Sequence, residues 1–404
     1  MKKILIAGPV FSRSGYGEHA RFVVDSLSTR PDLFDLYIYP LEWGNSNWSS
    51  GNLEKKKYYE SLLNKTSEHL QKSKSFDVHV QVTVPNEWTT DLAPCNIGVT
   101  AGVETDRLPD SWKPKILEMD KIIVTSEHIK GLFDKAIGSS KDIQVESVSY
   151  PVKDLEPADL SEELKLPDPF NFLTVAQYAP RKNLMSTIKC FVEEFRDEEV
   201  GLVVKTHMRN NSYADWCQLK IQLAGFLNQM GPRKCNVHFI SGAMSDEEMH
   251  GLYVHPKIHS YVTTTHGEGF GLPIFESAYS GLPVIAPAWS GQLDFLYAPF
   301  TKKTGKVEHR AHFEKIPFSL DEVHESHLMP GILEKGMKWC YINEDKFKKS
   351  LRKVYRSIAP CEETANSLKK HLLDKFSSEN QLSHMVQAIA GGVTEEEELV
   401  VDLL

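Results

Sequence analysis

Two glutamates eight positions apart, Glu268 and Glu276, enclose a glycine-containing segment that could bind a phosphate-bearing ligand. Glycines let the backbone approach a ligand closely, and the free N–H groups of a helix that starts at Pro273 would suit a diphosphate. Because a carboxylate repels a phosphate, each glutamate is expected to face a neutral part of the ligand. Sugar hydroxyls are good partners for charged acceptors. A glycine turn between two surface glutamates is the other interpretation.

Three cations stand near the ends of expected strands. Arg181 and Lys182 follow the expected strand 172–176 and open a helix. Because the helix dipole mildly disfavours cations at this end, their presence favours a role in neutralising a leaving diphosphate. Lys205, at the end of the expected strand 201–206, either lines the same pocket or is an ordinary surface lysine.

Two features of the first third of the chain are weaker signals. Gly15 and Gly17 precede an expected helix at 18–28, but they form neither a dinucleotide-binding fingerprint nor a P-loop. Glu104 and Asp106 lie in a loop after another expected strand. A capped loop before a helix would explain these two carboxylates without any ligand.

Strands and helices alternate in two series, which predicts two mostly parallel sheets covered on both faces. A stretch rich in proline and acidic residues, 154–169, indicates the linker between the series. The expected strands lie at 3–11, 36–39, 78–84, 97–99, 121–125 and 147–150 before the linker, and at 172–176, 201–206, 237–241, 260–263 and 283–286 after it.

The end of the second series is expected to be helical. Ser245 and Glu248 form a capping box that predicts a helix over 245–253. After Tyr297 we expect an irregular stretch, followed by helices at 344–357, 362–376 and 379–390. Two doubly wound domains of this kind place the carboxyl ends of their strands at a shared cleft, where ligands of such folds bind. The predicted fold class is therefore α/β, with two Rossmann-like doubly wound domains facing across a cleft.

Composition narrows the class of protein. The chain has 404 residues, 41% hydrophobic and 25% charged, which is typical of a globular protein of two to three domains. No run of 18 apolar residues could span a membrane, and the short apolar N-terminus is better explained as a strand than as a signal peptide. We therefore expect a cytoplasmic protein. The net charge of −9 argues against a basic nucleic-acid-binding surface, although part of it comes from an acidic run at 395–398.

The sequence offers no pattern typical of a metal site. The six cysteines include no C-x-x-C pair, so reduced thiols are expected. The histidine pairs include no H-E-x-x-H, and no D-x-D triplet of the kind that holds Mn²⁺ or Mg²⁺ on a diphosphate occurs. We predict no metal.

Glu268 and Glu276, with the segment GFGLPIF between them, resemble the E-x7-E motif of the retaining family 4 glycosyltransferases, which have the GT-B fold. The flanking segments 277–278, 281–285, 289–291 and 294–295 fit the same family. The resemblance implies that Glu268 contacts a donor sugar, that Glu276 contacts the ribose of a nucleotide, and that the backbone between them holds the diphosphate. The donor-binding residues implied in this motif are Gly269, Phe270, Gly271, Leu272 and Glu276.

The resemblance extends to both halves of the chain. Arg181 and Lys182 correspond to cations that contact the pyrophosphate, so they join Glu268 as the implied catalytic residues, with Gln177 and Lys205 beside them. The loop containing Gly15 and Gly17 would approach the donor diphosphate or the acceptor. The segment 101–112 is similar to an E-T-x-x-L-P-x-x-W segment of a subset of the family, which implies that Glu104 and Asp106 lie on the acceptor side.

The resemblance implies metal-independent transfer of a sugar from a nucleotide-diphosphate sugar, a UDP- or GDP-sugar, to an acceptor hydroxyl with retention of configuration. It requires no cofactor. The acceptor would be a glycan, a lipid or another hydroxyl-bearing molecule, and membrane contact would be peripheral at most. The implied domains are 1–153 with about 379–404, on the acceptor side, and 154–378, on the nucleotide-sugar side.

Three alternatives stay open at this point. A non-catalytic nucleotide-sugar or glycan-binding protein could use the same fold. A phosphorylase-like reaction would need a pyridoxal-phosphate lysine, for which the sequence shows no context. The acceptor could be a modified DNA base, although the acidic net charge speaks against nucleic acid.

Overall fold

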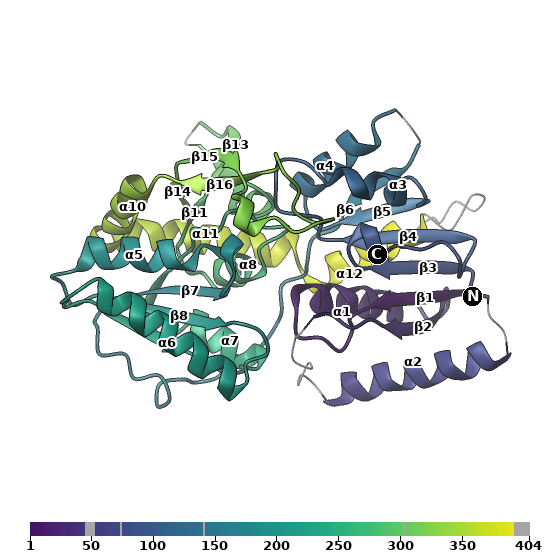
Figure 1. Cartoon of the computed structure of the whole chain (residues 1–404), viewed down its shortest axis with the longest axis horizontal. Helices are drawn as coiled ribbons and strands as arrows, with labels where there is room; N and C mark the ends of the chain where they lie inside the picture. Colours follow the sequence, from purple (N-terminus) through teal and green to yellow (C-terminus); the bar gives the residue numbers. More distant parts are fainter. Residues whose placement is uncertain (45–52, 73–74, 140–141, 303, 392–404) are drawn as a thin grey trace.

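The structure is a computed structural model that describes residues 1–44, 53–72, 75–139, 142–302 and 304–391. It contains two α/β halves side by side, each built on a six-stranded parallel sheet (Figure 1). This confirms the predicted fold class. The acidic run predicted at 395–398 lies outside the described residues.

The N-terminal sheet has the strand order β2-β1-β3-β4-β5-β6, and all of its pairs are parallel. Successive residues of β5 enter different cores, because Ile122 and Val124 pack with α4 whereas Ile123 packs with α1. Both faces are therefore covered. The strands are β1 (Lys2–Gly8), β2 (Phe34–Pro40), β3 (Val78–Val82), β4 (Cys95–Thr100), β5 (Lys121–Val124) and β6 (Gln144–Ser147), and the helices are α1 (Gly15–Ser28), α2 (Leu53–Lys72), α3 (Lys113–Ile116) and α4 (Glu127–Ile137).

The C-terminal sheet has the order β14-β11-β10-β7-β8-β9, again with parallel pairs only. The chain order reverses between the neighbours β7 and β10, and ligands of open α/β sheets bind at such a switch point. The strands are β7 (Asn171–Gln177), β8 (Gly201–His207), β9 (Asn236–Ile240), β10 (Ile258–Val262), β11 (Val284–Pro287) and β14 (Glu314–Ile316).

The helices of this half begin as the sequence indicates. The capping box of Ser245 and Glu248 is present at the start of α7. Gly271, with a left-handed φ of 100°, precedes the first residue of α8. The helices are α5 (Leu184–Phe195), α6 (Tyr213–Gln229), α7 (Asp246–Tyr253), α8 (Leu272–Tyr279), α9 (Leu293–Leu296) and α10 (Glu344–Arg356).

The stretch after Tyr297 was predicted to be irregular, and this prediction is wrong. Two antiparallel hairpins occur there, β12 (Tyr297–Thr301) with β13 (Val307–Ala311), and β15 (Phe318–Glu322) with β16 (Lys338–Ile342). Strands β13 and β15 are largely exposed and carry charged residues, so no apolar alternation marks them in the sequence. Strand β6 also ends three residues earlier than predicted.

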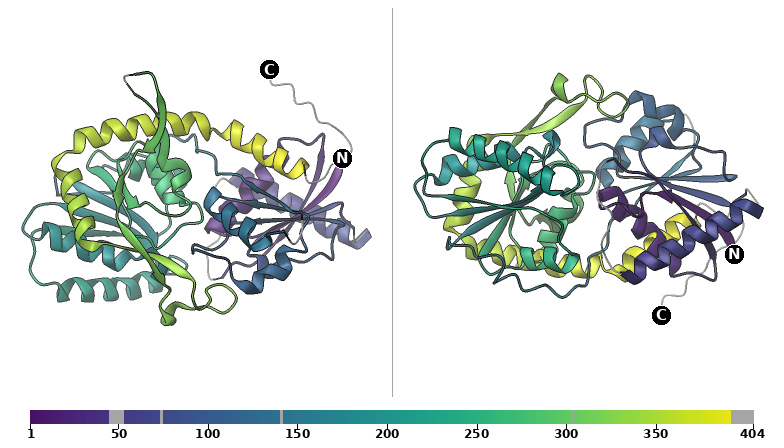
Figure 2. Two further views of the ribbon diagram at one scale, coloured as in Figure 1. Left: turned by 90° about the horizontal axis from the view of Figure 1, so that it is seen from above. Right: turned by 60° about the horizontal axis from the view of Figure 1, so that its bottom comes forward.

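The C-terminal helices connect the two halves. Helix α11 (Ile358–Lys375) contacts α8, and α12 (Ser378–Ala390), drawn in yellow, packs against α1 of the N-terminal half (Figures 1 and 2). A second connection is the loop 323–337 between β15 and β16, whose Gly331 carbonyl accepts a 2.7 Å hydrogen bond from Trp112 Nε1. The halves are thus joined on both sides of the cleft.

Three general features follow from the described residues. No helix among them is long and apolar enough to cross a membrane. No group of three or more metal-ligating side chains occurs within the described ranges. No disulfide joins any of the six cysteines, all of which lie within the described residues.

Candidate active site

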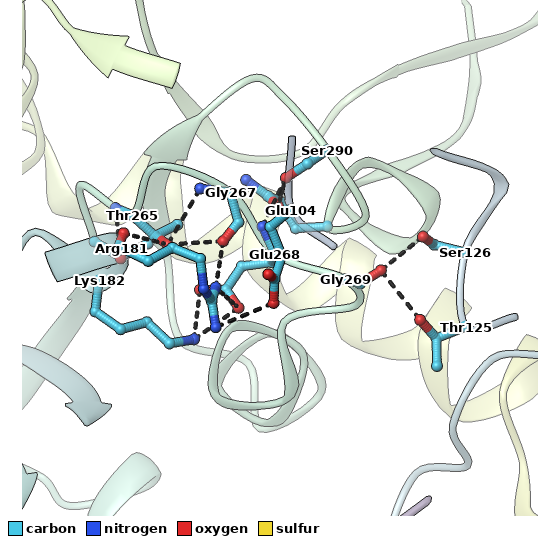
Figure 3. Close-up of polar contacts among 12 residues, drawn as sticks. Glu104, Thr125, Ser126, Arg181, Lys182, Thr265, Gly267, Glu268, Gly269 and Ser290 are labelled. Atoms are coloured by element: carbon cyan, nitrogen blue, oxygen red, sulfur yellow. Dashed lines mark hydrogen bonds and ion pairs between the residues drawn. The ribbon is translucent and has the colours of Figure 1, made fainter. Parts of the chain in front are cut away.

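The candidate site lies at the switch point of the C-terminal sheet. Arg181 and Lys182 belong to a short 3-10 turn that follows β7, and the glycine loop 263–271 follows β10. Because β7 and β10 are neighbours and parallel, their carboxyl ends bring the two segments together, as Figure 3 shows. Glu104 approaches the same place from the loop after β4 of the other half.

Glu268 is the centre of an ion-pair network (Figure 3). Its side chain is only 8% exposed and lies 2.7 Å from Lys182 Nζ through each carboxylate oxygen and 3.2 Å from Arg181 Nη1. Burial would raise the pKa of Glu268, but the charges of Lys182 and Arg181 outweigh it and lower the pKa to about 2. Glu268 is therefore ionised throughout the physiological range.

One of the two cations, Arg181, also pairs with a second carboxylate. Arg181 Nη2 lies 3.1 Å from Glu104 Oε1, so this ion pair joins the two halves. Burial lowers the pKa of Lys182, and the charge of Arg181 lowers it further. An additional anion near Lys182 would favour its charged form.

The glycine loop packs against the N-terminal half. Gly269 O accepts hydrogen bonds from Ser126 Oγ, at 2.6 Å, and from Thr125 Oγ1, at 3.2 Å. A Cβ atom on Gly269 would lie 2.6 Å from Ala101 O, and one on Gly267 would lie 2.8 Å from Glu104 O. At these two positions glycine allows the backbones of the two halves to meet, a role that sequence reasoning did not assign.

Two further residues of the motif, Phe270 and Leu272, have side chains that pack in the core. The Phe270 side chain is buried between Tyr150 of the N-terminal half and Phe275 and Phe295 of its own half, at ring distances of 5.0–5.1 Å. Leu272 packs partly buried against the same core. Only the backbone of these two residues is available for the donor-binding role predicted for them.

Glu276 occupies a different environment from Glu268. It accepts a 3.0 Å hydrogen bond from Tyr253 Oη in a pocket that Lys153, Asp246 and Tyr279 also line. Burial raises the pKa of Glu276 to about 7, because the Lys153 charge and the tyrosine hydrogen bond offset only part of it. This carboxyl can therefore donate or accept a hydrogen bond near neutral pH.

Two of the predicted donor-side residues, Lys205 and Gln177, lie near the carboxyl ends of β8 and β7. Lys205 Nζ donates to Gly242 O at 2.5 Å, and burial lowers its pKa to about 8, aided by the charge of Arg13 from the N-terminal half. Gln177 Nε2 donates to Met208 O at 2.9 Å. Neither side chain contacts the Glu268 network.

The glycines at the start of α1 differ from each other. A Cβ atom on Gly15 would meet nothing within 4 Å, whereas one on Gly17 would lie 2.0 Å from Ser12 O. Ser14 caps α1 by accepting from Gly17 N. Gly15 is thus open to an incoming group, and Gly17 is required by packing.

Glu104 and Asp106, both predicted to lie on the acceptor side, have different partners in the structure. Asp106 Oδ1 accepts a 2.7 Å hydrogen bond from Lys338 N of β16. Nearby, Glu334 accepts from Asp110 N and from Ser111 Oγ. Asp106 therefore anchors the 323–337 loop, while Glu104 enters the ion-pair network.

Several contributors were missed by sequence reasoning. Lys153, which stands just before the predicted linker and was assigned no role, forms ion pairs with Glu18 at 2.7 Å and with Asp246 at 2.9 Å. Ser290, in a left-handed conformation with φ of 71°, accepts from Glu268 N at 2.9 Å. A non-glycine residue before glycine gives no sequence signal for such a conformation.

Comparison with known proteins supports the fold alone. No family model matches the sequence, and no curated protein matches it. HepE of Anabaena, crystallised with UDP and glucose, is 12% identical with a TM-score of 0.63, covering 97% of this chain and 100% of HepE. Sucrose-phosphate synthase of Thermosynechococcus elongatus is 13% identical with a TM-score of 0.63, covering 97% and 99%. The pneumococcal O-GlcNAc transferase GtfA is 14% identical with a TM-score of 0.50, covering 83% and 60%. The chain therefore has the GT-B fold that these glycosyltransferases share.

Proposed function

We propose that this protein is a glycosyltransferase that moves a sugar from a nucleotide-diphosphate sugar to an acceptor hydroxyl. The observation that carries the proposal is the cluster of Arg181, Lys182 and Glu268 at the switch point, with the start of α8 beside it. Two cations with a helix N-terminus suit a diphosphate, and a buried ionised carboxylate suits sugar hydroxyls. HepE was crystallised with UDP-glucose, which makes that compound the first donor to test.

In this proposal the chain's cations stabilise the nucleoside diphosphate as it leaves. Removing one preorganised donor of this kind typically costs about 10²–10³ in rate. The chain has no D-x-D triplet, so the cations and the α8 N-terminus take the place of a metal and transfer is metal-independent. Because Lys182 and Arg181 hold Glu268, it acts on the sugar hydroxyls and not as a nucleophile.

We further infer retention of the anomeric configuration, as the resemblance to family 4 implies. The acceptor hydroxyl attacks from the face that the diphosphate leaves, and the departing phosphate oxygen accepts its proton. The acceptor would approach from the N-terminal half, residues 1–153 with 379–391, while residues 154–378 hold the donor. We also propose that the protein works in the cytoplasm, where cysteines outside disulfides, such as its six, stay reduced.

The proposal is tested by thermal shift with UDP, GDP, ADP and their sugars, with and without EDTA. A ligand at 100 times its dissociation constant stabilises a protein by about 2.7 kcal/mol. We expect one nucleotide sugar to raise the Tm equally in both conditions, and Lys182→Met to abolish the shift. The control is Lys189→Met, because Lys189 lies on α5, the helix that follows Lys182, and pairs with Glu344 at the surface.

Product analysis separates the competing functions. Slow hydrolysis of the bound donor, or transfer to simple sugar and lipid acceptors, would support an enzyme. Tight binding with no turnover would favour the non-catalytic nucleotide-sugar-binding protein. No response to any nucleotide would contradict both.

A further inference from the structure

The charges of the candidate site are balanced before any ligand enters. Two cations, Arg181 and Lys182, face two carboxylates, Glu268 and Glu104. A donor diphosphate would add two negative charges to this cluster. Because like charges at close range repel strongly in a partly buried site, one carboxylate has to leave when the diphosphate arrives.

Glu268 is not the carboxylate that can leave. Its side chain is 8% exposed and has contacts to both cations, and its backbone N–H is bonded to Ser290 Oγ. The Glu104 side chain is 22% exposed, and among the described residues it forms an ion pair with Arg181 alone. The Glu104 backbone is held where Gly267 packs on it, so only the side chain is free to turn away.

The surroundings of Glu104 indicate where a released carboxylate would act. Glu104 lies four residues after Thr100, whose hydroxyl accepts a 3.1 Å hydrogen bond from Gly102 N on the segment leading to Glu104. Tyr16 Oη is bonded to Thr100 Oγ1 at 2.8 Å, and both belong to the N-terminal half. This is the acceptor side of the cleft in the proposed function.

We propose that Glu104 is the resident counter-ion of Arg181, that the donor diphosphate displaces it, and that the freed carboxylate then binds an acceptor hydroxyl. The inference rests on the proposed function and adds an order of binding, donor first and acceptor second. Glu104 is a positioning residue in the empty site and an acceptor-binding residue in the loaded one. Displacement is feasible because partly exposed ion pairs are weak.

The test is Glu104→Gln, which keeps the size of the side chain and removes its charge. We expect UDP, or GDP if UDP does not bind the wild type, to bind the variant about three- to tenfold more tightly by calorimetry, since no carboxylate competes for Arg181. In transfer assays the donor KM should fall while the acceptor KM rises. A merely structural role would not move these two constants in opposite directions.

The control is Glu118→Gln, which removes a glutamate paired with Lys115 on the surface of the same half. Its nucleotide affinity should equal that of the wild type. If the wild type binds nucleotide and Glu104→Gln binds it equally or more weakly, the counter-ion inference is wrong while the proposed function stands. If the wild type binds no nucleotide, the proposed function itself fails.

Discussion

Glu268 and Glu276 carry the same side chain on one short segment, yet their surroundings move the pKa of each in opposite directions. Both are buried, and burial alone raises the pKa of a carboxyl. Two cations within 3.2 Å reverse this effect at Glu268, and the pKa falls to about 2. At Glu276 burial prevails and the pKa rises to about 7. One residue is a permanent anion, and the other titrates near neutral pH.

This difference predicts how stability depends on pH. Between about pH 4.5 and 7 the folded protein keeps a proton on Glu276 that the unfolded chain has lost. The free energy of unfolding therefore falls by about 3 kcal/mol as the pH rises over this range. Glu276→Gln should therefore raise the Tm at pH 8 by a few degrees and leave it nearly unchanged at pH 5. The measurement is thermal unfolding at both values. The exposed Glu162→Gln is the control, and an equal Tm difference at both pH values would contradict the prediction.

At the scale of elements, the loop between β10 and α8 contributes both to the candidate site and to the interface between the two halves. It supplies Glu268 to the site, and through the Gly269 carbonyl it binds the start of α4, where Ser126 both caps the helix and donates across the interface. Glu127 N likewise donates to Asp294 Oδ2 at 2.7 Å. Movement of the glycine loop is therefore coupled to the N-terminal half.

Replacing the glycine that allows this contact should separate the halves. In Gly269→Ala the new Cβ would lie 2.6 Å from Ala101 O, a backbone atom, so the interface has to shift. We expect a loss of about 1–3 kcal/mol and a larger radius of gyration by small-angle X-ray scattering. In contrast, Gly131→Ala, in the open on α4, should gain about 0.5–1 kcal/mol. An unchanged radius together with an unchanged Tm for Gly269→Ala would show that the contact does not hold the halves together.

At the scale of the whole molecule, the two segments that cross between the halves, around Val152 and around Phe376, are hydrogen-bonded to each other. Val152 N donates to Phe376 O at 2.8 Å, and Ser378 Oγ donates to Val152 O at 3.0 Å. Beside them Lys153 connects Glu18 of α1 with Asp246 of α7. Burial would lower the pKa of Lys153, but the charges of Glu18, Glu276 and Asp246 raise it, so this bridge stays charged.

Removing the bridge should loosen the arrangement of the two halves. Lys153→Met leaves Glu18 and Asp246 without their shared cation, at a cost of about 1–3 kcal/mol. We expect a lower Tm and a broader distance distribution in small-angle scattering. Lys165→Met, in the linker that follows Lys153 and largely exposed, is the matched control. If the two variants behave alike, Lys153 does not act as a bridge.

The sequence by itself determined the local parts of this protein. The βα alternation, the linker and the capping box of α7 were predicted, because apolar periodicity and capping depend on residues close together in the chain. The segment from Glu268 to Glu276 and the pair Arg181 and Lys182 were also found, since their residue types at strand ends indicate a phosphate-binding chemistry. The hairpins after Tyr297 were missed because one strand of each, β13 and β15, is largely exposed and lacks an apolar pattern.

Only the tertiary structure decided which of these residues meet. Glu104 pairs with Arg181, whereas Asp106, two positions on, anchors a loop of the other half. The pKa of Glu268 is lowered by Lys182 and Arg181, which lie elsewhere in the chain, whereas the pKa of Glu276 is raised by the burial that the fold imposes on it. Charge and protonation are set by what surrounds a group in space, and a one-dimensional pattern does not contain that distance.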